Sequence, residues 1–230
     1  IALLADDGSV MELRRRFAPG LVTALIRLEG KAVGLIANDP AILGGAIDAD
    51  AADKAARFMQ LCDAFGLPLL SLCDTPGFMV GPEAEKTALV RHVSRMCVTA
   101  AGLSVPFVTL VLRKGYGLGA MAMAGGSTHA TDATLAWPTG EFGGMGLEGA
   151  VRLAYRAELA AAPEGPAREA LFRDYVDRLY EKGKALNVAA VLEIDDVIDP
   201  ADSRARVMSA FRAHGGFDTS RDLMPRIDTW

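Results

Sequence analysis

Short apolar runs alternate with helical patterns along the middle of the sequence, and this order restricts the fold more than any other feature. The runs at 67–73, 106–112 and 133–137 have the length and composition of buried strands. Helical periodicity fills 48–65, before the first run, and 83–102, between the first and the second. Strands that alternate with helices in this way form βαβ units around a parallel sheet. The sequence therefore predicts an α/β protein.

The flanking segments extend this pattern. Two further strands, 21–28 and 31–38, are joined at Glu29-Gly30 and predict a hairpin. A short helix is expected at 120–124, longer helices at 148–162, 166–182 and 201–214, and an irregular tail from Gly215. We expect a single domain over 1–230. The chain begins with Ile1, inside an apolar run, so we expect it to be part of something longer.

The glycines are concentrated in one segment. Ten of the 24 glycines fall between Gly115 and Gly149. The part written Gly117-Leu-Gly-Ala-Met-Ala122 follows a predicted strand and precedes a helix, as a dinucleotide-binding fingerprint does. That fingerprint needs an acidic residue after the next strand, and the strand at 133–137 ends in Trp-Pro instead. Two interpretations stay open: a tight packing turn, or backbone N–H groups that stabilise an oxyanion at a helix start.

Composition and motifs exclude several classes of function. The net charge of −5 argues against a general nucleic-acid binder. Three cysteines without CxxC spacing indicate reduced thiols in the core. The sequence has no secretory signal and no uninterrupted apolar run of about 18 residues, so we expect a cytoplasmic protein without a membrane span.

Side chains with obvious catalytic or metal-binding roles are scarce. Asp48, Asp50 and Asp53 lack the glycine and glutamate of a calcium loop, and capping of a helix explains them better. The three histidines are isolated, and neither a GxSxG nor a P-loop motif is present, so we expect no metal. Any chemistry is therefore expected to rest on backbone dipoles and a cofactor.

Five motifs occur in an order that resembles a known family. They are Asp74-Thr-Pro-Gly-Phe78, Arg91-His92, Arg113-Lys-Gly-Tyr-Gly-Leu-Gly-Ala120, Ala136-Trp-Pro-Thr139 with Glu141, and Met145-Gly146 with Gly149-Ala-Val151. Together they resemble the carboxyltransferase (beta) subunit of biotin-dependent acyl-CoA carboxylases, of the propionyl-CoA and methylcrotonyl-CoA type. The resemblance covers most of the sequence up to about Arg206.

The resemblance implies a fold and an active site that is divided between two halves of the subunit. Subunits of that family have two halves, each a crotonase-like ββα superhelix, of which the N-terminal half binds acyl-CoA and the C-terminal half binds carboxybiotin. This chain is similar to the C-terminal half, with extra C-terminal helices, and the acyl-CoA half is absent from it. The resemblance further implies biotin on a carrier protein, a biotin carboxylase as partner, a homo-oligomer from dimer to hexamer, and an enzyme of the ligase or transferase class.

The resemblance also assigns roles to residues. Two backbone N–H groups of the family hold the ureido oxygen of biotin, and these correspond to Leu118 and Gly119, with Gly117 before them. The family uses biotin itself as the base that removes the α-proton of the acyl-CoA, so no catalytic side chain is required. The residues expected to bind biotin are Thr75, Pro76, Gly77, Phe78, Gly115, Tyr116, Pro138, Thr139 and Glu141.

Some assignments stay open at this point. The turn at 74–78 is either a wall of the biotin pocket or purely structural, and Arg91-His92 fits helix packing or a subunit contact better than catalysis. Met121 stands where propionyl-CoA enzymes commonly have Asp, which predicts a longer or different acyl chain. Two rival functions are a biotin-dependent acyl-CoA decarboxylase and, for the isolated chain, a non-catalytic biotin-binding and oligomerisation module.

Overall fold

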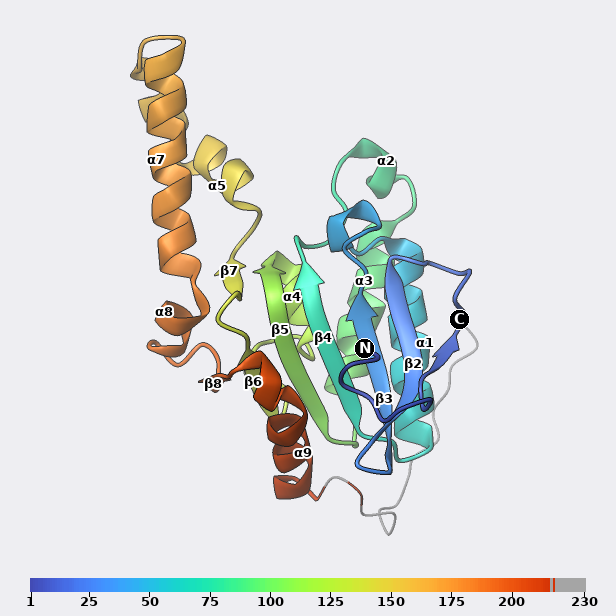
Figure 1. Cartoon of the computed structure of the whole chain (residues 1–230). Coiled ribbons are helices and arrows are strands. Elements are labelled where there is room, and N and C mark those ends of the chain that lie inside the picture. Colours follow the sequence, from blue (N-terminus) through green and yellow to red (C-terminus); the bar gives the residue numbers. More distant parts are fainter. Residues whose placement is uncertain (216, 218–230) are drawn as a thin grey trace.

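A mixed sheet forms the body of the protein in the computed structural model, which describes residues 1–215 and 217 (Figure 1). The strands follow the order β1-β2-β3-β4-β5-β6-β8, and β7 pairs with β5. The first three strands are antiparallel, and the pairs β3–β4, β4–β5, β5–β6, β5–β7 and β6–β8 are parallel. Their bounds are Met11–Leu13 (β1), Leu21–Leu28 (β2), Lys31–Asn38 (β3), Leu69–Thr75 (β4), Phe107–Tyr116 (β5), Ala133–Ala136 (β6), Glu141–Gly143 (β7) and Asp196–Val197 (β8).

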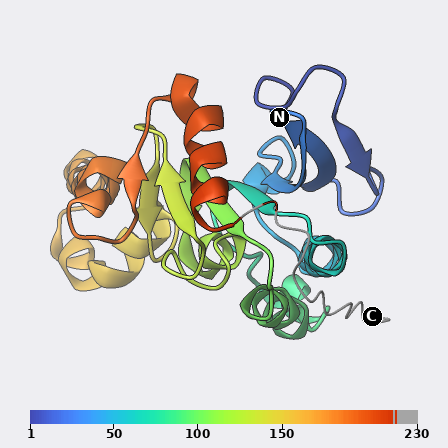
Figure 2. The same cartoon turned by 90° about the horizontal axis from the view of Figure 1, so that it is seen from below.

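Helices cover both faces of this sheet. Figures 1 and 2 show α1 and α3 on one face and α9 on the other. The α-helices are Ala49–Ala64 (α1), Pro82–Glu85 (α2), Leu89–Ala101 (α3), Gly117–Met123 (α4), Leu147–Ala154 (α5), Arg156–Ala161 (α6), Pro166–Gly183 (α7), Ala185–Ala189 (α8) and Ser203–Ala213 (α9). Short 3-10 turns span Leu43–Gly45 and Pro200–Asp202.

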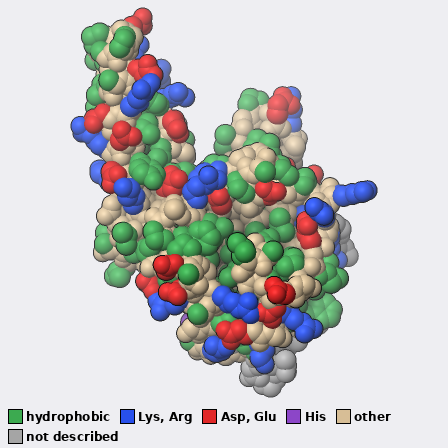
Figure 3. Space-filling view, in the orientation of Figure 1, with side chains coloured by type: hydrophobic (Ala, Val, Ile, Leu, Met, Phe, Trp, Pro, Cys, Tyr) green, Lys and Arg blue, Asp and Glu red, His purple; other side chains and the backbone are tan. Residues whose placement is uncertain are grey.

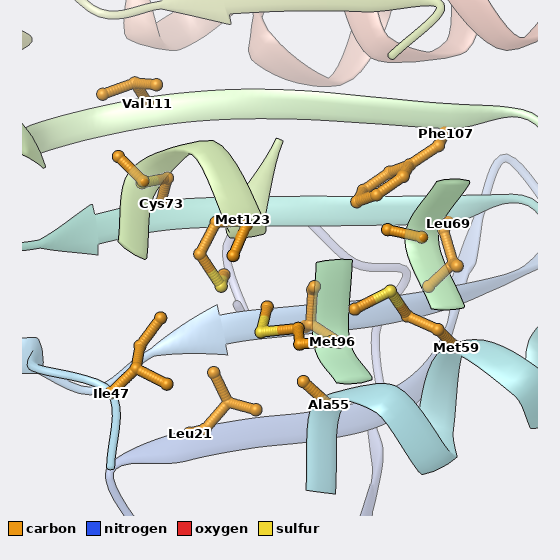
Figure 4. Close-up of a cluster of buried hydrophobic side chains, with 14 of the residues drawn as sticks. Leu21, Ile47, Ala55, Met59, Leu69, Cys73, Met96, Phe107, Val111 and Met123 are labelled. Carbon is orange, nitrogen blue, oxygen red and sulfur yellow. The ribbon is translucent and has the colours of Figure 1, made fainter. Parts of the chain in front are cut away.

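The parallel strands are buried on both faces because their side chains alternate between two apolar layers. In β4, Leu69 and Cys73 join the layer under α1, α3 and α4, whereas Leu70 and Leu72 join the layer under α9. Figure 4 shows the first layer, in which Met59, Met96 and Met123 come from three helices and meet over the sheet. The predicted α/β class and crotonase-like fold are confirmed.

The predicted hairpin is also confirmed. Strands β2 and β3 pair from Leu21↔Asn38 to Leu28↔Lys31, and the turn residues Glu29 and Gly30 have φ angles of 52° and 75°. Such positive values at both central positions belong to the type I′ turn that suits a two-residue hairpin.

Several predicted boundaries are wrong. The helix expected at 83–102 breaks into α2 and α3, because Ala88 takes a left-handed conformation (φ 54°). The helix expected at 148–162 breaks into α5 and α6 at Tyr155, whose ring stacks on Tyr175 with centroids 4.1 Å apart. The strand expected at 106–112 continues to Tyr116, and the short helix expected at 120–124 begins at Gly117. The tail expected from Gly215 lies, apart from Gly215 and Phe217, outside the described residues.

Helices α5, α6 and α7 form an arm that projects from the sheet (Figure 1). Besides the stack of Tyr155 on Tyr175, Arg152 lies 5.2 Å from the ring centroid of Phe172 and joins α5 to α7. Most arm side chains remain exposed or half-buried. Among the described residues, no helix is both long and apolar enough to cross a membrane.

Candidate functional site

The junction between β5 and α4 presents backbone N–H groups at the start of a helix. Tyr116 is still extended, and Gly117 turns the chain with a φ of 61°, a value that favours glycine. Leu118 and Gly119 then form the first turn of α4. N–H groups in a first helical turn have no acceptor within the helix and lie at its positive end. The junction can therefore stabilise a negatively charged oxygen.

The turn after β4 packs directly on this first helical turn. A Cβ atom at Gly119 would lie 2.6 Å from the carbonyl carbon of Gly77 and 2.9 Å from the amide nitrogen of Phe78. Only glycine at position 119 allows the two backbones to approach so closely. The turn is itself held by Thr75, whose buried hydroxyl accepts from the Gly77 N–H (3.1 Å) and donates to its carbonyl (3.2 Å).

An ion pair ties the ends of β4 and β5 together just before this contact. The buried carboxylate of Asp74 accepts from Arg113 Nε (3.3 Å) and Nη2 (3.0 Å), and from the Lys114 backbone N–H (3.2 Å). The Asp74 N–H in turn donates to Asn38 Oδ1 (3.1 Å) at the end of β3. Lys114 Nζ donates to the carbonyl of Gly44. These bonds fix three strand ends relative to one another, and with them the position of α4.

Tyr116 and Glu141 join β5 to β7 beside the junction. The Tyr116 hydroxyl donates to Glu141 Oε2 at 2.5 Å, and the strands pair at Gly115↔Phe142. Burial, together with the hydrogen bond and charge of Glu141, raises the pKa of Tyr116 above its ordinary value. The phenol is therefore protonated at neutral pH and donates its hydrogen bond to the Glu141 carboxylate.

A cavity of about 540 Å³ opens beside the start of α4. It runs between α4, the segment from β7 to α5, and the ends of α7 and α8. In Figure 3 hydrophobic side chains gather where the arm joins the body. The lining residues are Val111, Gly115, Gly117, Leu118, Ala120, Met121, Ala124, Thr128, Phe142, Gly143, Gly144, Met145, Leu147, Ala150, Leu179, Lys182, Gly183, Val188, Val191 and Glu193.

The structure brings most of the expected site residues together, but not all. Gly115, Gly117 and Leu118 line the cavity, and Gly119 lies against the turn that contains Thr75, Pro76, Gly77 and Phe78. Tyr116 and Glu141 lie beside it in β5 and β7. Pro138 and Thr139 do not line the cavity; both are exposed, and the Thr139 hydroxyl donates to the Leu112 carbonyl (2.6 Å), three residues before Gly115.

Sequence reasoning missed the wall that the arm contributes. Leu179, Gly183 and Val188 come from segments with no glycine-rich or polar motif that would mark them as part of a site. The tight contact of Gly183 with the Phe142 carbonyl leaves no room for a Cβ atom and explains why a glycine ends α7. A glycine at the end of a helix is common. Gly183 therefore gave no indication in the sequence that it also packs against Phe142 beside the cavity.

Three other motifs have structural roles. Asp48 caps α1 by accepting from the Ala51 N–H at 2.8 Å, as predicted. His92 Nδ1 lies 2.7 Å from Asp53 Oδ2, and Arg95 also pairs with that carboxylate, so this part of α3 packs on α1 as expected. Cys62 and Cys73 are buried in the core, and burial raises the pKa of the Cys73 thiol to about 12.

Comparison with known proteins places this chain in one family. The model of the carboxyl transferase domain matches residues 1–217. The methylmalonyl-CoA decarboxylase subunit alpha of Propionigenium modestum is 37% identical over 225 residues, which is 98% of this chain and 42% of that protein. The chain spans about two fifths of the length of the curated relatives that it matches.

Two solved structures share the fold. A single-chain, multi-domain long-chain acyl-CoA carboxylase is 58% identical, with a TM-score of 0.82 over 90% of this chain and 20% of the other. The transcarboxylase 12S hexamer with methylmalonyl-CoA bound is 34% identical, with a TM-score of 0.86 over 99% of this chain and 43% of the other. These matches confirm the resemblance seen in the motifs: the chain belongs to the carboxyl transferase domain family.

Proposed function

We propose that this chain is the carboxybiotin-binding, C-terminal half of an acyl-CoA carboxyltransferase, and that it transfers CO2 from carboxybiotin to the α-carbon of an acyl-CoA. The β5–α4 junction carries this proposal, because it offers two N–H groups beside a largely apolar cavity. An uncharged ring with a polar ureido oxygen suits such a combination. When bound, carboxybiotin supplies the CO2 and a ring nitrogen that acts as base.

The residues of the chain then have distinct tasks. The N–H groups of Leu118 and Gly119 donate to the ureido oxygen as negative charge develops on it, an interaction that strengthens towards the transition state. Gly117 sets the backbone angle that presents them. The turn from Thr75 to Phe78 packs on the first turn of α4, and the pair of Tyr116 with Glu141 joins β5 to β7 just before it. Gly115 lines the cavity and completes the assigned biotin contacts, whereas Pro138 and Thr139 lie outside it.

The partners follow from the division of the active site. The acyl-CoA half is supplied by a longer protein or a second subunit, and the biotin by a carboxyl carrier that a biotin carboxylase charges. We propose a homo-oligomer, as in the hexameric transcarboxylase 12S. The isolated chain is expected to turn over no acyl-CoA, because half of the site is missing.

One experiment tests the function directly. The full-length protein that contains this chain is incubated with its charged biotin carrier and a set of acyl-CoAs, and labelled CO2 in the acyl product is counted. The proposal predicts label in at least one carboxylated acyl-CoA, and loss of that label in Gly119→Val. Absence of transfer to every acyl-CoA from a charged carrier would contradict it.

The reverse direction is the second candidate, because a methylmalonyl-CoA decarboxylase subunit is 37% identical to the chain. The same N–H groups serve both directions, so the junction does not distinguish them. The net direction of the reaction distinguishes them. A decarboxylase with a sodium-pumping partner releases CO2 from a carboxylated acyl-CoA without ATP, whereas a carboxylase consumes ATP and bicarbonate.

A further inference from the structure

A basic loop, residues 14–20, joins β1 to β2. Arg14, Arg15 and Arg16 follow one another at its start, and all three are exposed. Arg15 pairs with Glu12 at 3.5 Å, whereas Arg14 and Arg16 have no ion-pair partner among the described residues. Figure 3 shows basic side chains that project from the right edge of the molecule, where Figure 1 places the segment between β1 and β2. In a chain with a net charge of −5, this loop is a local concentration of positive charge.

Buried groups fix the shape of the basic loop. The ammonium group of Lys54, a residue that is 1% exposed, donates to the carbonyls of Ala18 (3.2 Å) and Leu21 (2.6 Å). Arg14 and Ala18 have positive φ angles of 53° and 44°, which residues other than glycine rarely adopt. Such conformations persist only where the surrounding structure enforces them, and they are concentrated at functional sites. The arginines therefore stand on a rigid support.

The basic loop lies at the same edge of the sheet as the β5–α4 junction. Leu21, the first residue of β2, pairs with Asn38 at the end of β3, and β3, β4 and β5 run parallel. Three strand spacings of about 4.8 Å separate β2 from β5, so the loop lies roughly 14 Å from the junction across the sheet. The three arginines do not line the cavity beside α4. They border the proposed biotin site without forming part of it.

A protein that delivers biotin to the junction covers this part of the surface. A typical protein–protein contact buries about 800 Å² on each partner, an area roughly 16 Å in radius. Centred on the junction, where Leu118 is 69% exposed, such a contact extends to the basic loop. Contacts of this kind have a polar rim, and charges in the rim accelerate and orient the encounter of two proteins. The arginines lie where such rim charges are expected.

We infer that the basic loop docks an acidic face of the biotin carrier protein, with Arg14 and Arg16 as its main contacts. The inference rests on the proposed function, because that function requires a carrier at the junction. Arginine suits the role, because its guanidinium stays charged and binds a carboxylate through two parallel hydrogen bonds. The net charge of −5 repels an acidic carrier as a whole, so a basic area beside the site also fixes the carrier's orientation.

Charge reversal with a matched control tests the inference. Arg14→Glu combined with Arg16→Glu reverses the charge of the basic loop, and Arg27→Glu is the control. Arg27 is also exposed, but it lies six residues along β2 from Leu21, about 20 Å away at the opposite end of the strand. The full-length protein receives an acyl-CoA with a labelled carboxyl group, and transfer of the label to the biotin carrier or to free biotin is measured at low and high salt.

Two further variants separate charge from shape. Arg14→Lys combined with Arg16→Lys keeps the positive charge of the loop. Arg16→Glu alone leaves the left-handed residue Arg14 unchanged and replaces the double reversal if that protein does not fold. Thermal unfolding checks the fold of each variant, and analytical ultracentrifugation checks its assembly.

The expected loss is confined to the carrier. In the double reversal, kcat/KM for the carrier falls about tenfold or more at low salt, because electrostatic attraction no longer speeds the encounter. The difference from the unmodified protein shrinks at high salt, which screens exposed charges. Transfer to free biotin stays unchanged, since free biotin needs no docking surface. Arg27→Glu matches the unmodified protein, and the lysine variant retains most of its activity with the carrier.

Four results would overturn the inference and leave the proposed function intact. They are an equal loss with carrier and free biotin, no loss with the carrier, a raised KM for the acyl-CoA, and a changed oligomer size. The third would assign the loop to the phosphates of coenzyme A, and the fourth would make it a subunit contact. Absence of transfer from the unmodified protein to either acceptor overturns the proposed function itself.

Discussion

The β5–α4 junction and the projecting arm are held together by different kinds of contact. At the junction, main chain packs against main chain: Gly119 lies against the Gly77 backbone, and Gly45 lies against the Asp74 carbonyl. In the arm, α5 and α7 meet through side chains such as Tyr155 and Tyr175, and most of their surface is exposed. Backbone contacts leave almost no freedom to adjust, whereas side-chain contacts tolerate change. The comparison predicts that small changes at the junction have large effects and large changes in the arm have small ones.

The largest effect is expected from Gly119→Val. The added side chain collides with the backbone of Gly77 and Phe78, so either α4 or the turn after β4 must move. We expect a loss of about 1–3 kcal/mol in the free energy of unfolding. CO2 transfer should fall by roughly 10²–10³-fold, because the oxyanion donors are displaced. Chemical denaturation and the labelled-CO2 assay measure the two effects.

Gly102→Ala is the matched control for this substitution. Its φ of −99° suits any residue, and the nearest atoms would lie 3.6 Å from an added Cβ, an ordinary contact. The free energy of unfolding should change by no more than about 0.5 kcal/mol. Equal losses in Gly102→Ala and Gly119→Val would mean that the close backbone approach has no special importance.

Asp74→Ala is expected to destabilise the protein by a similar amount but to reduce CO2 transfer less than Gly119→Val does. The substitution leaves the Lys114 N–H and the half-exposed guanidinium of Arg113 without their acceptor. We expect a loss of about 1–3 kcal/mol in the free energy of unfolding. Transfer should slow as well, because the ends of β4 and β5 are no longer tied together.

The exposed pair of Glu83 in α2 with Lys86, its C-cap residue, provides the comparison for Asp74. Its atoms are 2.6 Å apart, but both side chains are largely exposed, and exposed pairs contribute little. Glu83→Ala should therefore change the free energy of unfolding by less than about 1 kcal/mol. If Asp74→Ala is as mild as Glu83→Ala in chemical denaturation, the Asp74 carboxylate does not hold the strand ends together.

The smallest effect is expected in the arm. Tyr175→Ala removes the ring on which Tyr155 stacks, and such a stack contributes about 0.5–1.5 kcal/mol beyond burial. Hydrogen exchange should become faster in α5 and α7 and stay unchanged in β4 and β5. Faster exchange in the two strands would show that the arm and the junction are one cooperative unit.

The sequence predicted the parts of the molecule that depend on local pattern. Apolar runs and helical spacing located β2 to β6 and α1, and the glycines marked the β5–α4 junction. The sequence did not predict the interruptions of the two helices at Ala88 and Tyr155, because helical spacing continues through both residues. The break at Tyr155 coincides with the stack on Tyr175, a contact twenty residues away.

Prediction of the site was limited by the same difference between local and distant contacts. Leu118 and Gly119 were assigned through the resemblance, because the motif that carries the assignment lies in one segment. The arm residues Leu179 and Val188 reach the cavity only through the packing of α7 and α8 beside β7. Thr139 was assigned to the site through the resemblance, yet its hydroxyl bonds the Leu112 carbonyl and it does not line the cavity. A motif read from the sequence does not specify which residue of a neighbouring strand its side chain contacts.

Replacement of the Gly119 amide by an ester tests the central claim most directly. The ester, introduced with glycolic acid in place of glycine, removes one N–H donor and adds no atom that collides with Gly77. If this N–H stabilises the developing oxyanion, kcat for CO2 transfer falls by about 10²–10³-fold while the protein remains folded. An ester variant that folds and transfers CO2 at the unmodified rate would contradict the account.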